Sequence, residues 1–140
     1  RKKGVALKFN VMPSAVRGKR IVVVDDSIVR GNTTGPLVRL LRGAGAAEVH
    51  VRISSPPIRH PCYMGVDMGR EEALIAHRLS VPEIRAEVGA DSLAYLSLEA
   101  LLAALDSGAL GARGLCSACF SGSYPIEACG AAGKDSFEFA

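Results

Sequence analysis

The order of apolar and polar positions in the first part of the chain predicts a strand, a helix and a second strand. Residues 21–24 are four consecutive β-branched residues, a run typical of a strand buried on both faces of a parallel sheet. Leucines then recur at helical spacing over 36–42; Pro36 suits the first helical turn, and two glycines end the helix. Residues 49–53 alternate and predict the next strand. This order predicts a βαβ unit with a right-handed crossover and a parallel sheet.

The second half of the chain predicts further helices and one short strand. A helix is expected over 71–79, and Ser80 followed by Glu83 has the spacing of a capping box that begins another helix. Residues 93–96 are a strand candidate, and a helix is expected from Ser97 to about Leu105. From residue 107 onward the chain is rich in Gly, Ala and Cys, and little regular structure is expected there.

Length and composition indicate a globular protein of about one domain. The chain has 140 residues, of which 49% are apolar and 22% charged, and this composition excludes wholesale disorder. No apolar run approaches the roughly 18 residues needed to span a bilayer, and no basic stretch followed by an apolar segment opens the chain. We therefore expect a cytoplasmic protein without a membrane partner. Because the first residue is Arg1 rather than Met, we also expect a fragment that lacks its N-terminal part.

The net charge of +3 conceals an uneven distribution. Residues 1–59 carry twelve Lys or Arg and three Asp or Glu, whereas residues 60–140 carry five and eleven. A basic half can meet nucleic acid, a phosphorylated small molecule or an acidic protein surface. Nucleic acid is disfavoured, because the sequence has no zinc-finger spacing, no basic helix with heptads and only 5% aromatic residues for base stacking.

The most informative residues follow the first predicted strand. Asp25 and Asp26 stand at its carboxyl end, which is where parallel α/β sheets bind ligands. The loop after them is small and hydroxylic and leads into a helix N-terminus, so backbone N–H groups can surround an anion there. We expect a sugar phosphate, with the acids at its ribose hydroxyls and Mg²⁺ and the loop at its 5′-phosphate. The candidate loop residues are Ser27, Arg30, Gly31, Asn32, Thr33 and Thr34.

Four cysteines form a second candidate site. Without signs of secretion, metal binding is more plausible than disulfide formation. Cys116 and Cys119 form a CxxC pair, a spacing that zinc and iron–sulfur clusters both use. Cys62 is a plausible third ligand or a buried small apolar residue. Cys129 is either a fourth ligand or a bystander.

These motifs resemble known families. Residues 22–34, with an apolar strand, two acids and Gly31-x-Thr33, resemble the phosphoribosyl pyrophosphate (PRPP) motif of type I phosphoribosyltransferases. Segments 53–67, 89–97 and 116–125 resemble the glutamine PRPP amidotransferase (amidophosphoribosyltransferase) family, in its iron–sulfur branch. The resemblance implies an α/β fold: residues 1–75 as the C-terminal part of a Rossmann-like phosphoribosyltransferase domain, and 76–140 as a helical, cysteine-containing region.

The resemblance also implies a reaction. The family converts PRPP, glutamine and water to 5-phosphoribosylamine, glutamate and pyrophosphate, at the start of purine synthesis. Ammonia comes from an N-terminal glutaminase domain that this chain lacks, so the chain alone is expected to be inactive. A homo-oligomer, a tetramer by resemblance, is also implied. Asn32 replaces a common Thr, and Gly35-Pro36 replaces a pair that is often basic; the second change leaves nucleotide feedback contacts in doubt.

Specific roles follow from the same resemblance. Asp25 and Asp26 are expected to hold the ribose and take part in a Mg²⁺ site, and the loop residues to hold the 5′-phosphate. Three cysteines are expected to ligate a [4Fe–4S] cluster whose fourth ligand lies upstream, and Cys129 matches no family ligand. The cluster ligands implied are Cys62, Cys116 and Cys119. Four basic residues are expected to end a loop that closes over PRPP: Arg1, Lys2, Lys3 and Lys8.

Two alternatives stay open. One is another PRPP-binding protein, such as a salvage phosphoribosyltransferase or a transferase-like regulator; those lack the segments around Cys62 and the CxxC pair. The other is a zinc or redox module, which would leave Asp25, Asp26 and the phosphate loop unexplained.

Overall fold

A computed structural model describes residues 10–106 and 115–125 of the chain, and its centre is a sheet of three parallel strands. The strands are β1 (Arg20–Asp25), β2 (Glu48–Ile53) and β3 (Ser92–Tyr95), in the spatial order β1-β2-β3. Arg20 is opposite Glu48, and His50 is opposite Ser92. All three strands were predicted from the sequence, and the parallel pairing of the βαβ unit is confirmed.

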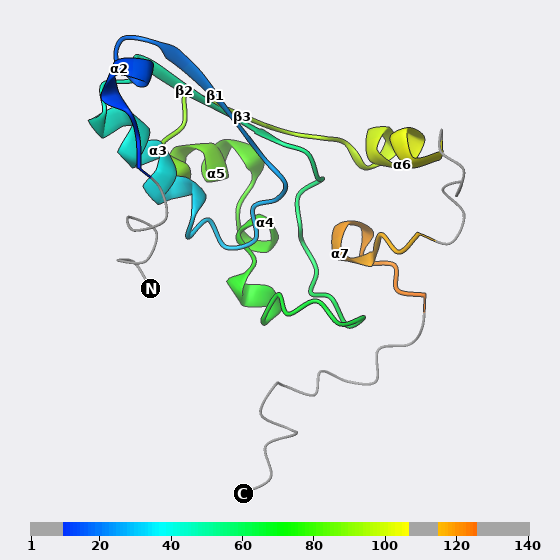
Figure 1. The fold of residues 1–140 in the computed structure, drawn as a ribbon. Helices are drawn as coiled ribbons and strands as arrows, with labels where there is room; N and C mark the ends of the chain where they lie inside the picture. Colours follow the sequence, from blue (N-terminus) through cyan, green and yellow to red (C-terminus); the bar gives the residue numbers. More distant parts are fainter. Residues whose placement is uncertain (1–9, 107–114, 126–140) are drawn as a thin grey trace, which may run out of the picture.

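Helices connect the strands and cover one face of the sheet. α3 (Thr34–Gly43) joins β1 to β2, and a 3-10 helix η1 (Glu71–Ala73), α4 (Ile75–Arg78) and α5 (Val81–Val88) precede β3. Figure 1 shows α3 and α5 on the same side of the strands. The remaining helices are α2 (Pro13–Val16), α6 (Leu98–Asp106) and α7 (Ala118–Ser121).

The core lies between the sheet and these helices. Val49 and Val51 of β2 are fully buried, and they share a cluster with Val38 of α3 and with Ile84 and Val88 of α5. The two helices therefore bury their apolar sides against the same strand, and removal of this surface from water stabilises the arrangement.

The face of β1 that is turned away from α3 and α5 is more exposed than the sequence predicted. The run 21–24 was expected to be buried on both faces, yet Val22 is 59% exposed and Val24 is 72% exposed. Side chains alternate along a strand, and in the part of the chain that the structure describes α3 and α5 cover only the other face. The prediction of a doubly buried strand is therefore wrong within these residues.

The helix predicted over 71–79 is interrupted at Leu74. Leu74 has an extended backbone (φ −76°, ψ 122°) and a fully buried side chain. The next amide, of Ile75, donates to the carbonyl of Val29 at 2.9 Å, in the loop after β1. The break therefore allows this segment to support the β1–α3 loop.

The predicted start of α5 is confirmed. Ser80 and Glu83 form a capping box, in which the Glu83 carboxylate accepts hydrogen bonds from the Ser80 amide at 2.7 Å and its hydroxyl at 2.6 Å. The box satisfies a donor that the helix leaves unpaired, and so fixes where the chain enters α5.

Candidate functional site

The loop between β1 and α3 lines a pocket of about 620 Å³. Residues 27–34 form one side of it, and residues 67–69, which we call the facing segment, form the other. All six loop residues predicted for the phosphate therefore lie together. Thr34, the first residue of α3, is 3% exposed.

Gly31 fixes the shape of this loop. Its φ of +75° lies in the left-handed region that favours glycine. A Cβ at this position would also lie 3.0 Å from Cδ1 of Ile75. The loop thus rests closely on α4, and a larger residue at position 31 would both strain the backbone and press on a buried isoleucine.

Asp25 and Asp26 stand immediately before the residues that line the pocket. Asp25 ends β1 and is half-buried, whereas Asp26 is exposed. The Asp26 amide donates to Oδ1 of Asp25 at 3.0 Å, and the Ser27 hydroxyl donates to Oδ2 of Asp26 at 3.3 Å. The structure thus places a carboxylate pair at the carboxyl end of β1, where the sequence predicts it.

The two carboxyls have opposite tendencies to ionise. Burial raises the pKa of Asp25, and its side-chain hydrogen bond with Asp26 raises it further. The same hydrogen bond, together with the backbone amides, lowers the pKa of Asp26. Two acids this close cannot both ionise freely. A cation or hydroxyl donors at this position would relieve their repulsion.

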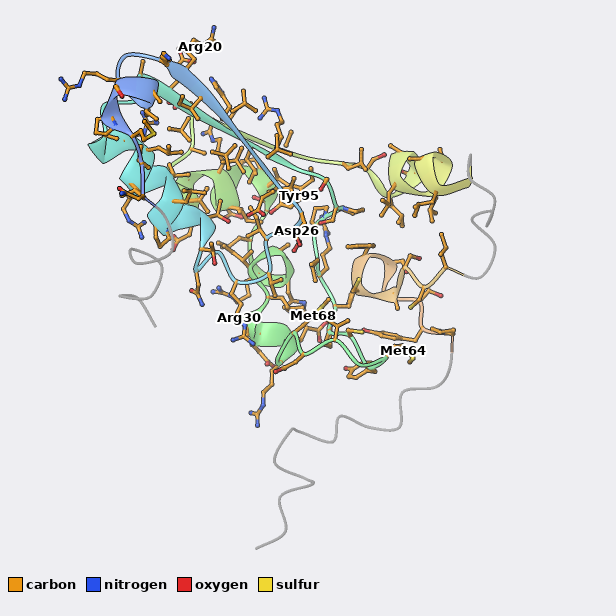
Figure 2. The ribbon with its side chains drawn as sticks, in the orientation of Figure 1. Arg20, Asp26, Arg30, Met64, Met68 and Tyr95 are labelled. Atoms are coloured by element: carbon orange, nitrogen blue, oxygen red, sulfur yellow. The ribbon has the colours of Figure 1, made fainter. Side chains whose placement is uncertain are left out.

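The Arg30 side chain extends from the loop to the facing segment and contacts it. Its Nη2 donates to the carbonyl of Met68 at 3.1 Å, and Figure 2 shows the two residues next to each other. A Cβ on Gly69 would lie 3.3 Å from Cζ of Arg30 and would collide with Nη2. The guanidinium therefore packs directly on the backbone of residue 69.

The facing segment is the part of the site that the sequence analysis missed. Asp67, Met68 and Gly69 line the pocket, but they follow Arg30 by almost forty residues, and spacing gives no sign of the contact. Gly65 and Gly69 both have positive φ. Two glycines so close together are a signal from which a tightly turned loop could have been predicted, but not the residue that the loop contacts.

The end of β3 carries a buried hydroxyl at the same end of the sheet as the two acids. Tyr95 is opposite Ile53, which is opposite Asp25, and Figure 2 shows Tyr95 and Asp26 at the same end of the sheet. Burial raises the pKa of Tyr95 to about 12. Its hydroxyl has no hydrogen-bond partner among the described residues.

Three cysteines gather at some distance from the pocket. The Cys119 carbonyl in α7 accepts hydrogen bonds from the amides of Arg59 at 3.0 Å and His60 at 3.1 Å, two residues before Cys62. Burial raises the pKa of the Cys119 thiol, and the charges of Cys62 and Cys116 raise it further. Cys119 therefore lies within electrostatic reach of both Cys62 and Cys116.

Aromatic contacts reinforce this meeting of distant segments. The Tyr124 hydroxyl donates to the carbonyl of Pro61 at 2.7 Å, and the rings of Tyr63 and Tyr124 lie 5.0 Å apart. Among the residues described, no group of three or more His, Cys, Asp or Glu is arranged to hold a metal ion. Cys129, Arg1, Lys2, Lys3 and Lys8 lie outside the described residues.

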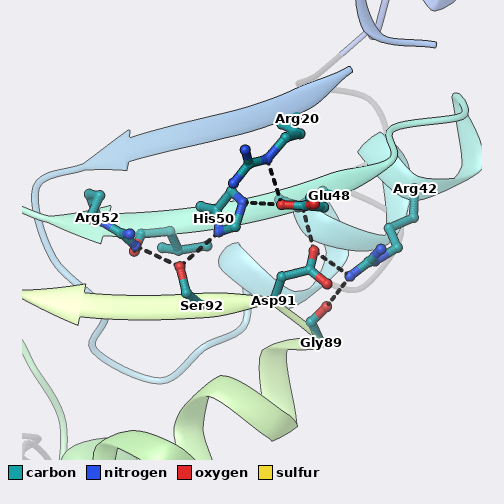
Figure 3. A network of polar contacts seen from close by, with 10 residues as sticks. Arg20, Arg42, Glu48, His50, Arg52, Gly89, Asp91 and Ser92 are labelled. Carbon is teal, nitrogen blue, oxygen red and sulfur yellow. Dashed lines mark hydrogen bonds and ion pairs between the residues drawn. The ribbon is translucent and has the colours of Figure 1, made fainter. Parts of the chain in front are cut away.

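A separate polar network crosses the sheet (Figure 3). The Asp91 carboxylate accepts hydrogen bonds from the Val49 amide at 2.6 Å and from Arg42 at 2.7 Å. These bonds join the residue before β3 to β2 and to the end of α3. They stabilise the scaffold and lie away from the pocket-lining residues.

Comparison with known proteins finds several amidophosphoribosyltransferases that are similar to this chain. The chain is 52% identical over 132 residues to an amidophosphoribosyltransferase of Drosophila melanogaster, covering 89% of this chain and 24% of that protein. It is 52% identical to the amidophosphoribosyltransferase of Bacillus subtilis, covering 91% of this chain and 27% of that protein. No family model matches the chain.

Solved structures share the fold as well. The glutamine PRPP amidotransferase of B. subtilis, complexed with ADP and GMP, superposes with a TM-score of 0.74 at 49% identity, covering 88% of this chain and 28% of that one. The structure of an allosteric regulatory enzyme of purine biosynthesis gives the same values. None of the helices in the described ranges has the length and apolar character to cross a membrane. The chain spans about a quarter of the length of its curated relatives, and over that span it belongs to the amidophosphoribosyltransferase family.

Proposed function

We propose that the chain is part of a glutamine-dependent enzyme that converts PRPP, glutamine and water to 5-phosphoribosylamine, glutamate and pyrophosphate. The observation that carries this proposal is the carboxylate pair at the end of β1 beside a pocket lined by residues 27–34. The names of the relatives support the same reaction. In this proposal residues 1–75 bind PRPP and residues 76–140 carry most of the cysteines, although β3 of the second part completes the sheet.

The pocket loop suits the 5′-phosphate of PRPP. The small residues Gly31 and Ser27 leave backbone N–H groups accessible to an anion, and α3 begins at Thr34 with its N-terminal dipole directed to the same loop. Asn32 and Thr33 are exposed and add hydrogen-bonding side chains. Arg30 adds positive charge near the pocket, so the loop neutralises the phosphate by dipoles and charge together.

The carboxylate pair suits the ribose end. Asp25 and Asp26 offer oxygen atoms that accept hydrogen bonds from the ribose hydroxyls, and their charge stabilises positive charge that develops on the ribose as pyrophosphate leaves. Carboxylate oxygens are also the ligands that Mg²⁺ takes, and Asp25 and Asp26 stand side by side at the end of β1. When bound, Mg²⁺ would neutralise the pyrophosphate.

The chemistry of the cysteine set favours a [4Fe–4S] cluster, although in the described part of the structure the three thiols are not arranged to hold a metal ion. Cys62, Cys116 and Cys119 supply thiols from two segments that the backbone bonds of Cys119 bring together, and thiolates are the usual ligands of such clusters. A fourth ligand would come from elsewhere in the protein. When bound, the cluster would join α7 to the segment before it, because metal-binding free energy is also folding free energy.

The remaining parts of the proposal concern the whole protein. Ammonia would come from a glutaminase domain outside this chain, and the enzyme would act as a cytoplasmic homo-oligomer. A salvage phosphoribosyltransferase is less consistent with the gathered cysteines, and a zinc or redox module leaves the pocket beside Asp25 and Asp26 without a role.

The test is PRPP binding by the full-length protein. Hydrogen exchange is measured with Mg²⁺ alone and with Mg²⁺ plus PRPP, and glutamine-dependent formation of pyrophosphate is assayed in parallel. We expect PRPP to slow exchange over residues 27–34 and leave α5, which is remote from the pocket, unchanged. Unaltered exchange in the loop together with no pyrophosphate release would refute the proposal. Consumption of PRPP with a nucleobase instead of glutamine would favour a salvage enzyme.

A further inference from the structure

The pocket has two sides, and the second side belongs to a stretch with no strand or helix that precedes η1. The facing segment, residues 67–69, follows Gly65 and ends at Gly69, two glycines of positive φ, shortly before η1 begins at Glu71. The residues before it are open to solvent, with Met64 42% exposed and Val66 57% exposed. Apolar burial therefore contributes little to holding this part of the chain in place.

Arg30 connects the facing segment to the phosphate loop. Its Nη2 donates to the Met68 carbonyl at 3.1 Å, across 38 residues of sequence. A hydrogen bond from a charged guanidinium to a carbonyl is among the stronger ones in proteins. The guanidinium also lies against Gly69, at a place where any side chain would collide with it.

We propose that Arg30 is a positioning residue, which holds residues 67–69 across the pocket and so sets the space available to the phosphate end of the ligand. Gly69 is the second half of this contact, because a Cβ at position 69 would displace the guanidinium from the place it occupies beside the backbone. The inference rests on the proposed function for the identity of the ligand, but the Arg30 contact itself does not. It gives Arg30 a positioning role through Met68 and Gly69, in addition to the positive charge that Arg30 adds near the pocket.

The test uses four variants of the full-length protein: Arg30→Met, Gly69→Ala, their combination, and Gly65→Ala. Gly65 has a φ of +111° but nothing within 4 Å of a Cβ placed there. Gly65→Ala therefore strains the same segment without disturbing Arg30, and it is the matched control. Hydrogen exchange over residues 64–70 is measured without ligand, and the PRPP KM and glutaminase kcat are measured separately.

We expect Arg30→Met and Gly69→Ala each to raise exchange over 67–69 by about tenfold and the PRPP KM by a similar factor, as for loss of one charge-assisted hydrogen bond. The glutaminase kcat of the Gly65→Ala control should equal that of the wild type. Because both changes remove one contact, the double variant should be no worse than the poorer single variant. Gly65→Ala should keep the wild-type PRPP KM.

Two results would overturn the inference. One is a raised PRPP KM in Arg30→Met with unaltered exchange over 64–70, which would make Arg30 a direct ligand. The other is a wild-type KM and exchange in Gly69→Ala. If wild-type protein fails to bind PRPP, the proposed function fails, while faster exchange of 67–69 in Arg30→Met and Gly69→Ala still supports the positioning contact.

Discussion

At the scale of single residues, the acidic pair shows how two identical side chains acquire different properties. Asp25 is half-buried at the end of β1 and has a raised pKa, whereas Asp26 is exposed and has a lowered pKa. Asp26 therefore holds its charge at lower pH than Asp25 does. A ligand that depends on a fixed negative charge should depend on Asp26 in particular.

Asp26→Asn in the full-length enzyme tests this dependence. The change keeps the shape of the side chain and removes its charge, so we expect the PRPP KM at limiting Mg²⁺ to rise by about tenfold or more, as for loss of a charge-assisted contact. Glutaminase activity should be retained. Glu72→Gln, at an exposed position of η1, is the matched control. An unchanged PRPP KM and kcat in Asp26→Asn would argue against the assignment.

At the scale of elements, the sequence predicts strands, helices and loops that are continuous in sequence, and it misses features that depend on contacts between distant segments. The strands and α3 follow from short runs of β-branched residues and leucines, and α5 follows from its capping box. The pocket loop is predictable because it is continuous in sequence. The break at Leu74 is not, because it depends on a hydrogen bond from Ile75 to Val29 across the fold.

Asp91 joins β2 and α3 just before β3, and this contact should make the stability of the fold depend on pH. The Val49 amide, and next the Arg42 side chain, lower the pKa of Asp91. A carboxyl with a lowered folded-state pKa adds stability that is present above its unfolded pKa of 3.8 and is lost as the pH falls through the folded value.

We therefore expect Asp91→Asn to lower the melting temperature at pH 7, and the gap between wild type and variant to shrink as the pH falls below about 4. Thermal unfolding of both proteins from pH 7 to pH 3 measures this. Glu87→Gln, at an exposed position of α5, should leave the melting temperature unchanged at every pH. A gap that stays constant down to pH 3 would contradict the role given to the Asp91 charge.

At the scale of the whole molecule, two observations belong together: the span of the chain and the exposed face of its sheet. The chain spans about a quarter of its relatives, and its sheet exposes Val22 and Val24. The sequence predicted this face to be buried, because β-branched runs are typical of covered strands; it has no cover among the described residues. The cysteines, by contrast, gather through Arg59, His60 and α7 in a way that spacing alone does not reveal.

At this scale we predict the metal that the cysteine set, Cys62, Cys116 and Cys119, binds. Anaerobic purification of the full-length protein should give a brown sample with about four irons and four sulfides per chain. Cys116→Ser should bleach it and make the region around α7 sensitive to protease, because the link to residues 59–62 is lost. Cys129→Ser is the matched control and should stay brown. A colourless anaerobic preparation with one zinc per chain would reject the cluster and favour a zinc site.

The parallel sheet has a further consequence for how the protein acquires its structure. Arg20 meets Glu48 across 28 positions of sequence, and β3 reaches β2 only after another excursion through α4 and α5. No pair of strands in the described sheet can begin as a hairpin. Each pairing must first close a long loop. The entropy lost in closing it is offset only afterwards, when the contacts between the two strands have formed. Folding is therefore expected to be slow for a chain of this size, and during synthesis β1 leaves the ribosome before β2 and stays unpaired until β2 follows it.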